Sequence, residues 1–308
     1  MKKVIFMGTP DFAVPVLDML IHNYEVVLVV TQPDKMTGRK QILTPTPVKQ
    51  KALEHNIRVY QPIKIKDEYD IVLNTKADII ITCAYGQFIP KVILDYPEFG
   101  CVNVHASLLP KYRGGAPIHQ CLIDGCDKTG ITIMYMDSKM DQGDIIANCE
   151  YKIKDTDNVG TLHDELSVLG AKLLKETLPA IFNRINKRIK QDENEVTYAY
   201  NIKREQEHID FNKPGKEILN QIRGLNPWPV ANFLIEDLEY KVFEAYFIET
   251  EVKEASILID IKKDAIGITC KNGIIYVTDI KPFGKKRMKV LDYLNGINKN
   301  ELLNKRVK

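Results

Sequence analysis

The sequence predicts an α/β protein with two domains, on the basis of three observations. Over residues 1–188, short apolar segments with a strand-like pattern alternate with segments of helical spacing, which is typical of βαβ units and of a mostly parallel, Rossmann-like sheet. Residues 189–206 are polar and charged, and we expect them to form a linker. Short alternating strands recur over residues 207–308, which predicts a small, OB-like C-terminal β-barrel.

The first domain is expected to start with a strand at residues 3–7, followed by the turn Gly8-Thr9-Pro10 and a helix. Only Gly8 of the dinucleotide fingerprint G-x-G-x-x-G is present there, so a nicotinamide cofactor is not expected. A long polar loop is expected at residues 31–48. Further strands are expected at residues 25–30, 57–60, 77–83 and 101–105, and a long helix at 162–189 that Pro179 kinks or divides.

Composition places the chain among soluble globular proteins. Hydrophobic residues make up 44% and charged residues 27% of the 308 residues, and no apolar run approaches the ~20 residues that span a bilayer. The six cysteines form no C-x-x-C pair and no cluster with histidine, which argues against a metal site and a disulfide framework and indicates a reducing cytoplasm. Because the net charge is only +2, any nucleic-acid partner must be sought in local basic patches.

The clearest chemistry lies in residues 101–118, CVNVHASLLPKYRGGAPI. Strand alternation in the first part of this stretch places Asn103 and His105 on the same side, near the end of the strand. An amide can donate to a developing oxyanion, and an imidazole can move a proton near neutral pH. Taken alone, such a pair is more often a turn-capping asparagine and a structural histidine at a strand terminus.

Acidic side chains that could complete such a site occur in the segment Met140-Asp141-Gln142-Gly143-Asp144. Gly143 allows the backbone to turn tightly there, which can place the carboxylate of Asp141 beside a neighbouring strand end. Asp144 is the alternative carboxylate. We interpret Asp144 more simply as a cap of the turn after Gly143.

The loop after His105 favours a catalytic interpretation of these residues over a structural one. Its run SLLPKYRGGAP, together with the N-x-H pair and the later M-D-x-G-D segment, resembles the hallmark of the folate-dependent formyltransferases. Members of that family move a formyl group from 10-formyltetrahydrofolate to an amine. The resemblance implies that Asn103, His105 and Asp141 are catalytic. If Asp141 lies within hydrogen-bond reach of His105, its carboxylate is expected to orient the ring and to favour its protonated form. No covalent nucleophile is needed, and Ser107 lacks the G-x-S-x-G elbow.

The same resemblance implies a binding site for the folate co-substrate. The pterin is expected in an apolar slot against the SLLP turn and against the loop that ends the preceding strand. The residues that this assigns to folate binding are Ser107, Leu108, Leu109, Pro110, Tyr85, Gly86 and Gln87.

The acceptor amine is decided outside the catalytic core. Glycinamide ribonucleotide transformylases share the chemistry but are shorter and lack a second domain, whereas sugar-amine formyltransferases share SLLPKYRG and a similar C-terminal region. The segments GTPDFAVPVL, TQPDK…GR…TPTPVK and NPWP resemble the branch of the family that acts on methionyl initiator tRNA. This resemblance spans nearly the whole chain, more loosely in the C-terminal domain.

A tRNA substrate extends beyond any small pocket and requires phosphate contacts. Arg39 and Lys40 in the long loop are expected to bind the acceptor end, and Lys285 and Lys286, within KPFGKKRMK, to hold phosphates without reading sequence. We therefore expect a cytoplasmic monomer that formylates methionyl-tRNA, with neither a metal nor a membrane partner. A pure RNA-binding module, or a folate-binding regulator without turnover, would leave the three catalytic candidates without a role.

Overall fold

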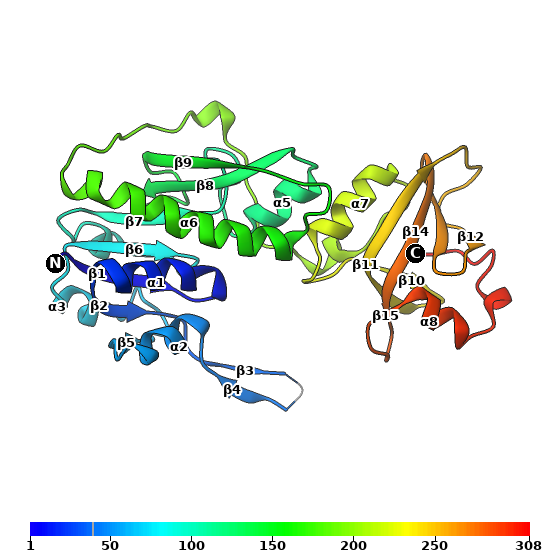
Figure 1. Ribbon diagram of the computed structural model, residues 1–308, viewed down its shortest axis with the longest axis horizontal. Helices are drawn as coiled ribbons and strands as arrows, with labels where there is room; N and C mark the ends of the chain where they lie inside the picture. The colour runs from blue at the N-terminus through cyan, green and yellow to red at the C-terminus, as the bar shows by residue number, and fades with distance from the viewer. Residues whose placement is uncertain (39) are drawn as a thin grey trace. The chain divides into compact units, whose positions relative to one another are not determined.

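The computed structural model describes residues 1–38 and 40–308 (Figure 1). Residue contacts divide the described chain into two compact units. The first consists of Met1–Pro117, Lys128–Lys152 and His163–Tyr200, and the second of Ile118–Asp127, Ile153–Leu162 and Asn201–Lys308. The division does not follow a single cut in the sequence, because two short segments that precede His163 belong to the second unit.

The first unit is organised around a seven-stranded sheet in the order β5-β2-β1-β6-β7-β8-β9. The pairs from β5 to β7 are parallel, and β8 and β9 extend the sheet in the antiparallel sense, which confirms the predicted mostly parallel, Rossmann-like sheet. Because β1, β6 and β7 are neighbours, their carboxyl ends meet at one edge, where open α/β sheets bind ligands. The strands are β1 (Lys3–Gly8), β2 (Glu25–Val30), β5 (Val59–Tyr60), β6 (Ile79–Cys83), β7 (Cys101–His105), β8 (Lys128–Tyr135) and β9 (Ile145–Lys152).

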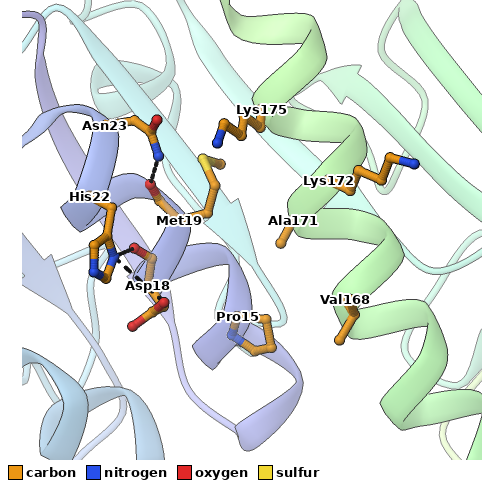
Figure 2. A pocket seen from close by; sticks show the side chains of 9 residues that line it. All are labelled: Pro15, Asp18, Met19, His22, Asn23, Val168, Ala171, Lys172 and Lys175. Atoms are coloured by element: carbon orange, nitrogen blue, oxygen red, sulfur yellow. Dashed lines mark hydrogen bonds and ion pairs between the residues drawn. The ribbon is translucent and has the colours of Figure 1, made fainter.

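Helices α1 (Val14–Asn23) and α6 (Val159–Phe182) line a shallow groove between them (Figure 2). α6 packs closely on β7, since a Cβ added to Gly170 would lie 2.9 Å from a methyl group of Val104. Cys101, on the other side of β7, belongs to a separate apolar cluster. That cluster also contains residues of β1, β2, β6, α3 (Asp70–Asn74) and α4 (Lys91–Leu94). Alternation along β7 therefore directs Asn103 and His105, like Cys101, away from α6.

Helix α6 is shorter than predicted. It ends at Phe182, and Pro179 lies in its last turn without dividing it. A proline cannot donate the backbone hydrogen bond to the preceding turn, so the helix ends within a few residues. Arg184 then adopts a φ of 57°, which redirects the chain.

The predicted loop at residues 31–48 contains regular structure. It forms a hairpin of β3 (Lys35–Thr37) and β4 (Ile42–Thr44) and then starts α2 (Pro47–Glu54). Figure 1 shows this hairpin projecting away from the parallel sheet. Lys40 is exposed in the turn that joins the two strands, whereas Arg39 lies outside the described residues.

The second unit contains an antiparallel sheet in the order β10-β11-β14-β13-β12, with β15 beside β14. Ile235 of β10 pairs with Val307, and Ile257, next to β12, pairs with Arg306, so the C-terminal segment covers both edges of this half-barrel. This confirms the predicted small β domain. Its elements are α5 (Pro117–Ile123), α7 (Gly215–Gly224), β10 (Asn232–Ile235), β11 (Leu238–Glu249), β12 (Leu258–Ile261), β13 (Ile266–Cys270), β14 (Gly273–Pro282), β15 (Met288–Lys289) and α8 (Val290–Asn295).

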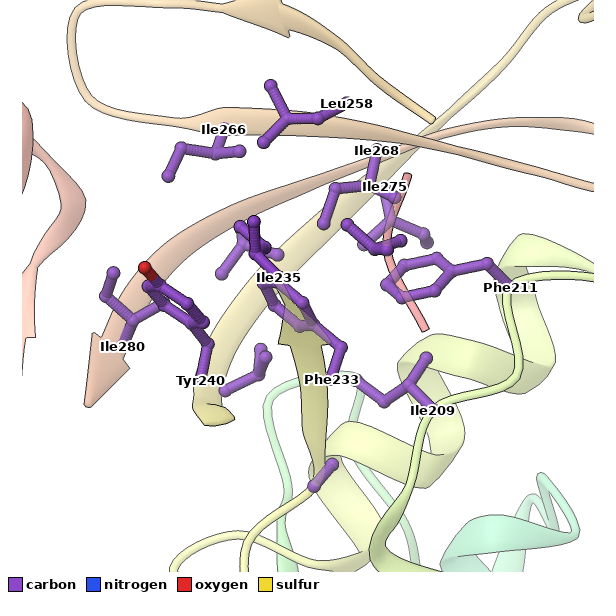
Figure 3. Packing of buried hydrophobic residues seen from close by; sticks show 14 of the residues in the cluster. Ile209, Phe211, Phe233, Ile235, Tyr240, Leu258, Ile266, Ile268, Ile275 and Ile280 are labelled. Carbon is purple, nitrogen blue, oxygen red and sulfur yellow. The ribbon is translucent and has the colours of Figure 1, made fainter. Parts of the chain in front are cut away.

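An apolar cluster packs against the inner face of the half-barrel sheet (Figure 3). Phe233 is near its centre: its ring meets Phe211 edge-on at 5.9 Å between centroids and stacks on Tyr240 at 5.6 Å. The hydroxyl of Tyr240 lies 3.0 Å from that of Tyr293, so the polar end of this buried ring is satisfied. The second unit therefore has a hydrophobic core of its own.

Candidate active site

The candidate site is built at the carboxyl end of β7. This strand is parallel to β6 on one side and antiparallel to β8 on the other, so its backbone is fixed from both sides. Asn103 and His105 extend from the face opposite α6, His105 being only 5% exposed. The period-two pattern of the sequence correctly placed the two side chains on one face.

The orientation of the Asn103 amide is set by the neighbouring strand. Thr82 of β6 is in register with Asn103, and its hydroxyl donates to Asn103 Oδ1 at 2.8 Å. With the oxygen held in this way, the NH₂ group must point away from Thr82. That NH₂ group makes no hydrogen bond to any residue in the described part of the chain. Two N–H donors of Asn103 are thus available to bond a carbonyl oxygen of a substrate.

We predict that Thr82→Val lowers kcat roughly five- to tenfold, the equivalent of about 1 kcal/mol for one missing hydrogen bond. Valine keeps the shape of threonine but cannot hold the Asn103 oxygen. Thr269→Val is a matched control, because Thr269 is also buried and its hydroxyl bonds the backbone of Ile257 in the second unit. A Thr82→Val enzyme with wild-type kcat would show that the amide is oriented by other means.

His105 is held in one tautomer by its surroundings. Its Nε2–H donates to the carbonyl oxygen of Tyr112 at 3.0 Å, which leaves Nδ1 facing the carboxylate of Asp141 at 3.7 Å. The same oxygen of Asp141 accepts from the N–H of Gly114 at 2.8 Å. The structure thus brings Asp141 to within ion-pair distance of His105, although not within hydrogen-bond distance.

Asp141 adopts a left-handed backbone conformation with φ 50°, which is uncommon for a residue other than glycine. Such a conformation persists only where surrounding contacts hold it. The nearby Asp144 has a different role: its carboxylate pairs with Arg188 at 2.9 Å on the surface. The geometry therefore favours Asp141 over Asp144 as the partner of His105.

The turn after β7 is fixed by Thr132 of β8. Thr132 donates its hydroxyl to Ser107 O at 2.7 Å and accepts from the N–H of Leu109 at 3.1 Å. The Ser107 hydroxyl is fully buried and donates to Lys111 O, which agrees with a structural role for this serine. The cysteines are equally unsuited to act as nucleophiles, because burial raises the pKa of the Cys101 and Cys83 thiols.

The other residues assigned to the folate lie at the end of β6. Tyr85 O accepts hydrogen bonds from Thr9 Oγ1 at 2.9 Å and from Gln32 Nε2 at 3.1 Å, which ties this loop to the turn after β1. The Gln87 amide bonds the backbone of residues 62, 63 and 65. Gly86 has φ 85°. Residues 85–87 and 107–110 thus follow adjacent strands, and their contact with the folate remains a prediction.

Three residues that hold the site together were not identified from the sequence: Thr82, Arg113 and Gln191. Thr82 could have been found, because it lies opposite Asn103 once the two strands are paired in register. The buried guanidinium of Arg113 donates to Gln191 and Glu193, and its hydrogen bonds lower the pKa of Glu193. No local pattern indicates Gln191, which lies in the predicted linker.

The candidate tRNA-binding lysines are exposed. Lys285 and Lys286 lie in the turn between β14 and β15. The neighbouring Arg287 and Lys289 have internal partners, since both bond the carboxylate of Asp279. Burial opposes ionisation of Asp279, but the hydrogen bonds from these two cations outweigh it and lower its pKa. Lys285, whose ammonium lies 5.4 Å from the centroid of the Tyr293 ring, and Lys286 pair with no carboxylate among the described residues, so they are better placed than Arg287 and Lys289 to bind phosphates.

An oriented amide donor beside an imidazole and a carboxylate, at the carboxyl end of parallel strands, is an arrangement that can support acyl transfer through a tetrahedral intermediate. The sequence of residues 1–178 matches the formyl transferase family, and that of residues 201–298 matches the family of formyl transferase C-terminal domains. The chain belongs to the formyl transferase family. Among the described residues, no group of three or more His, Cys, Asp or Glu side chains could hold a metal ion.

Relatives match the chain over nearly its whole length, among them two staphylococcal proteins. A Staphylococcus epidermidis protein named methionyl-tRNA formyltransferase is 51% identical over 303 residues, which covers 97% of this chain and 98% of the relative. A Staphylococcus aureus protein of the same name is 50% identical over 311 residues and is covered completely, as is this chain. No helix in the described part of the chain combines the length and apolar character needed to cross a membrane.

Solved structures support the fold. WlaRD, a sugar 3N-formyl transferase crystallised in the presence of dTDP and 5-N-formyl-THF, has a TM-score of 0.68 at 22% identity and covers 93% of this chain and 99% of its own. The N-formyltransferase from Helicobacter canadensis, in complex with folinic acid and dTDP-3-aminofucose, has a TM-score of 0.68 at 19% identity. The match covers 92% of this chain and 100% of the Helicobacter canadensis chain.

Proposed function

We propose that this protein transfers the formyl group of 10-formyltetrahydrofolate to the amino group of methionyl initiator tRNA, which yields N-formylmethionyl-tRNA and tetrahydrofolate. The observation that carries the proposal is the full-length identity of about half to relatives named methionyl-tRNA formyltransferase. Membership of the formyl transferase family and the folate ligands of the structural neighbours support a folate co-substrate.

In the proposed reaction, the neutral amine attacks the formyl carbon and forms a tetrahedral intermediate with a negatively charged oxygen. The NH₂ group of Asn103 donates to that oxygen. Nε2–H of His105 donates to the carbonyl oxygen of Tyr112, so the other ring nitrogen, Nδ1, is the one that accepts the proton lost by the amine. The bond between the formyl carbon and the folate nitrogen N10 then breaks, and the proton passes from His105 to N10. Asp141, at 3.7 Å, stabilises the charged imidazole between the two transfers.

The tRNA contacts are proposed on both units. Lys285 and Lys286 of the half-barrel hold phosphates, and the β3–β4 hairpin, with Lys40 in its turn, binds the acceptor end together with Arg39. The reaction needs no second protein, so we propose that the chain acts as a monomer. The six cysteines are free thiols, which supports a reducing cytoplasm as its location.

We predict that neutralising Lys285 and Lys286 weakens tRNA binding equally for formylatable and non-formylatable tRNAs. The slope of log K against log salt should fall by about 0.7–0.9 for each phosphate that the variant no longer binds. Salt-titrated binding measures this slope. A double lysine variant with the wild-type salt slope would remove the half-barrel turn from the tRNA interface.

Replacing Arg39 should instead lower kcat/KM for methionyl-tRNA and leave folate binding intact.

The proposed function is tested by turnover with 10-formyltetrahydrofolate and three acceptors: methionyl-tRNA, glycinamide ribonucleotide and an amino sugar nucleotide. We expect formyl transfer to methionyl-tRNA, detected as N-formylmethionine after the ester bond to tRNA is hydrolysed. Transfer to either small acceptor at a higher kcat/KM than to methionyl-tRNA would contradict the proposal.

A further inference from the structure

The chain between α6 and the end of the first unit is bonded to the active-site loops. Ile189 exchanges two backbone hydrogen bonds with Ile145, at 2.8 and 2.9 Å. Ala199 donates to Arg113 O at 2.7 Å and accepts from the N–H of Ala116 at 3.0 Å. This segment therefore lies against both the loop that follows β7 and the first residue of β9.

Gln191 uses both ends of its side-chain amide within this contact. Its Oε1 accepts from Arg113 Nε at 3.0 Å and from Arg113 Nη2 at 2.8 Å. Its Nε2 donates to Asp141 O at 2.7 Å and to Gly143 O at 2.8 Å. Because a guanidinium can only donate and a carbonyl can only accept, this orientation of the amide is the one that satisfies all four bonds.

The two carbonyl groups bound by Gln191 enclose the turn that carries Asp141. Gly143 packs so tightly that an added Cβ would lie 1.9 Å from Tyr135 O, which fixes the far side of the turn. Gln191 holds the near side, where Asp141 has its uncommon φ of 50°. The direction of the Asp141 carboxylate follows from this backbone conformation.

The other end of the amide controls the loop that holds His105. Arg113, which Gln191 and Glu193 bind, is 2% exposed and lies between Tyr112 and Gly114. Tyr112 O accepts from His105, and the N–H of Gly114 donates to Asp141. One amide thus connects the loop that orients His105 with the turn that presents Asp141.

We propose that Gln191 is a positioning residue for the formyl-transfer site, which sets the separation between Asp141 and His105 without touching the substrate. The inference rests on the proposed catalytic role of those two residues. It also gives the first part of the predicted linker a function, since the segment 189–200 supplies part of the framework of the active site.

The test distinguishes the hydrogen bonds that Oε1 of Gln191 accepts from those that its Nε2 donates. In Gln191→Glu the carboxylate still accepts from Arg113 but cannot donate to the two carbonyl groups, and its charge faces them. We expect kcat to fall about tenfold or more, because small displacements of catalytic groups are costly, while KM for both substrates changes little. We also expect the Nε2–H resonance of His105 to shift in the NMR spectrum of the variant.

Gln221→Glu is the matched control. Gln221 of α7 also donates from its amide nitrogen to two carbonyl oxygens, those of Gln206 and His208, at 2.9 and 2.8 Å. Each glutamate variant loses two hydrogen bonds from the amide nitrogen to backbone carbonyl oxygens, so the two should lose similar thermal stability. Of these two variants, only Gln191→Glu should have a lower kcat. Gln191→Met, which keeps the length of the side chain, has neither the hydrogen bonds of glutamine nor the charge of glutamate, and its kcat should fall as well.

The outcome is compared with Asp141→Asn measured in parallel. If both Gln191 variants retain the wild-type kcat while Asp141→Asn is impaired, the positioning role is refuted and the proposed site stands. If Asp141→Asn is itself fully active, the proposed role of Asp141 fails, and the inference fails with it. A fall in kcat in Gln191→Glu that Gln221→Glu reproduces would also refute the inference, since the effect would then be one of general stability.

Discussion

Replacing Asn103 or His105 with alanine is expected to lower kcat for formyl transfer by a factor of about 100 or more, with the fold retained. Asn103→Ala removes the two N–H donors that Thr82 directs away from itself. His105→Ala removes the group that, in the proposed reaction, carries the proton from the amine to the leaving nitrogen. Neither side chain belongs to the apolar clusters of the sheet, so the loss should fall on the rate rather than on stability.

The measurement is steady-state turnover with methionyl-tRNA and 10-formyltetrahydrofolate, on variants whose folding is confirmed by circular dichroism and thermal unfolding. Binding of the folate should be nearly unchanged, because the donors act mainly on charge that develops in the transition state. Turnover near the wild-type rate in either variant would remove that residue from the mechanism.

Asp141→Asn is expected to lower kcat roughly 10- to 100-fold. The amide oxygen of asparagine can still accept from the N–H of Gly114, so the loop keeps this hydrogen bond. The variant lacks the negative charge 3.7 Å from His105 Nδ1. In the proposed reaction, that charge stabilises the imidazole ring while the ring holds the proton.

Asp144→Asn is the matched control for this prediction. Asp144 lies in the same loop, carries the same charge and pairs with Arg188 on the surface. Asp144→Asn should leave kcat nearly unchanged. It should also lower the stability only slightly, because exposed ion pairs contribute about 0–1 kcal/mol to stability. Equal losses of kcat in the two variants would mean that the charge of the loop, and not the position of Asp141, matters for the reaction.

The features that were correctly predicted are those encoded locally. Alternating apolar segments located the strands, and the period of two placed Asn103 and His105 on one face of β7. The β3–β4 hairpin was not found, because its strands are only three residues long and lack a buried face, as the exposure of Met36 and Ile42 shows. Helix α6 was extended too far because apolar spacing continued beyond Pro179.

The features that were missed depend on residues far apart in the sequence. The half-barrel edges are covered by residues 306 and 307, which pair with Ile257 and Ile235, and no local pattern indicates such a pairing. Thr82 becomes visible only through the register of two parallel strands. Gln191 acts on backbone carbonyl groups some fifty residues away, at Asp141 and Gly143, and such contacts leave no periodicity in the sequence.

The central claim is that Asn103 acts as an oriented donor to the oxyanion, and Asn103→Asp tests it most directly. Aspartate keeps the size of the side chain and can still accept from Thr82, but it offers no N–H donor and adds a negative charge beside the developing oxyanion. In a single-turnover experiment with saturating 10-formyltetrahydrofolate and methionyl-tRNA, the rate of formyl transfer should fall below that of Asn103→Ala. A rate for Asn103→Asp equal to or above that of Asn103→Ala would contradict the account.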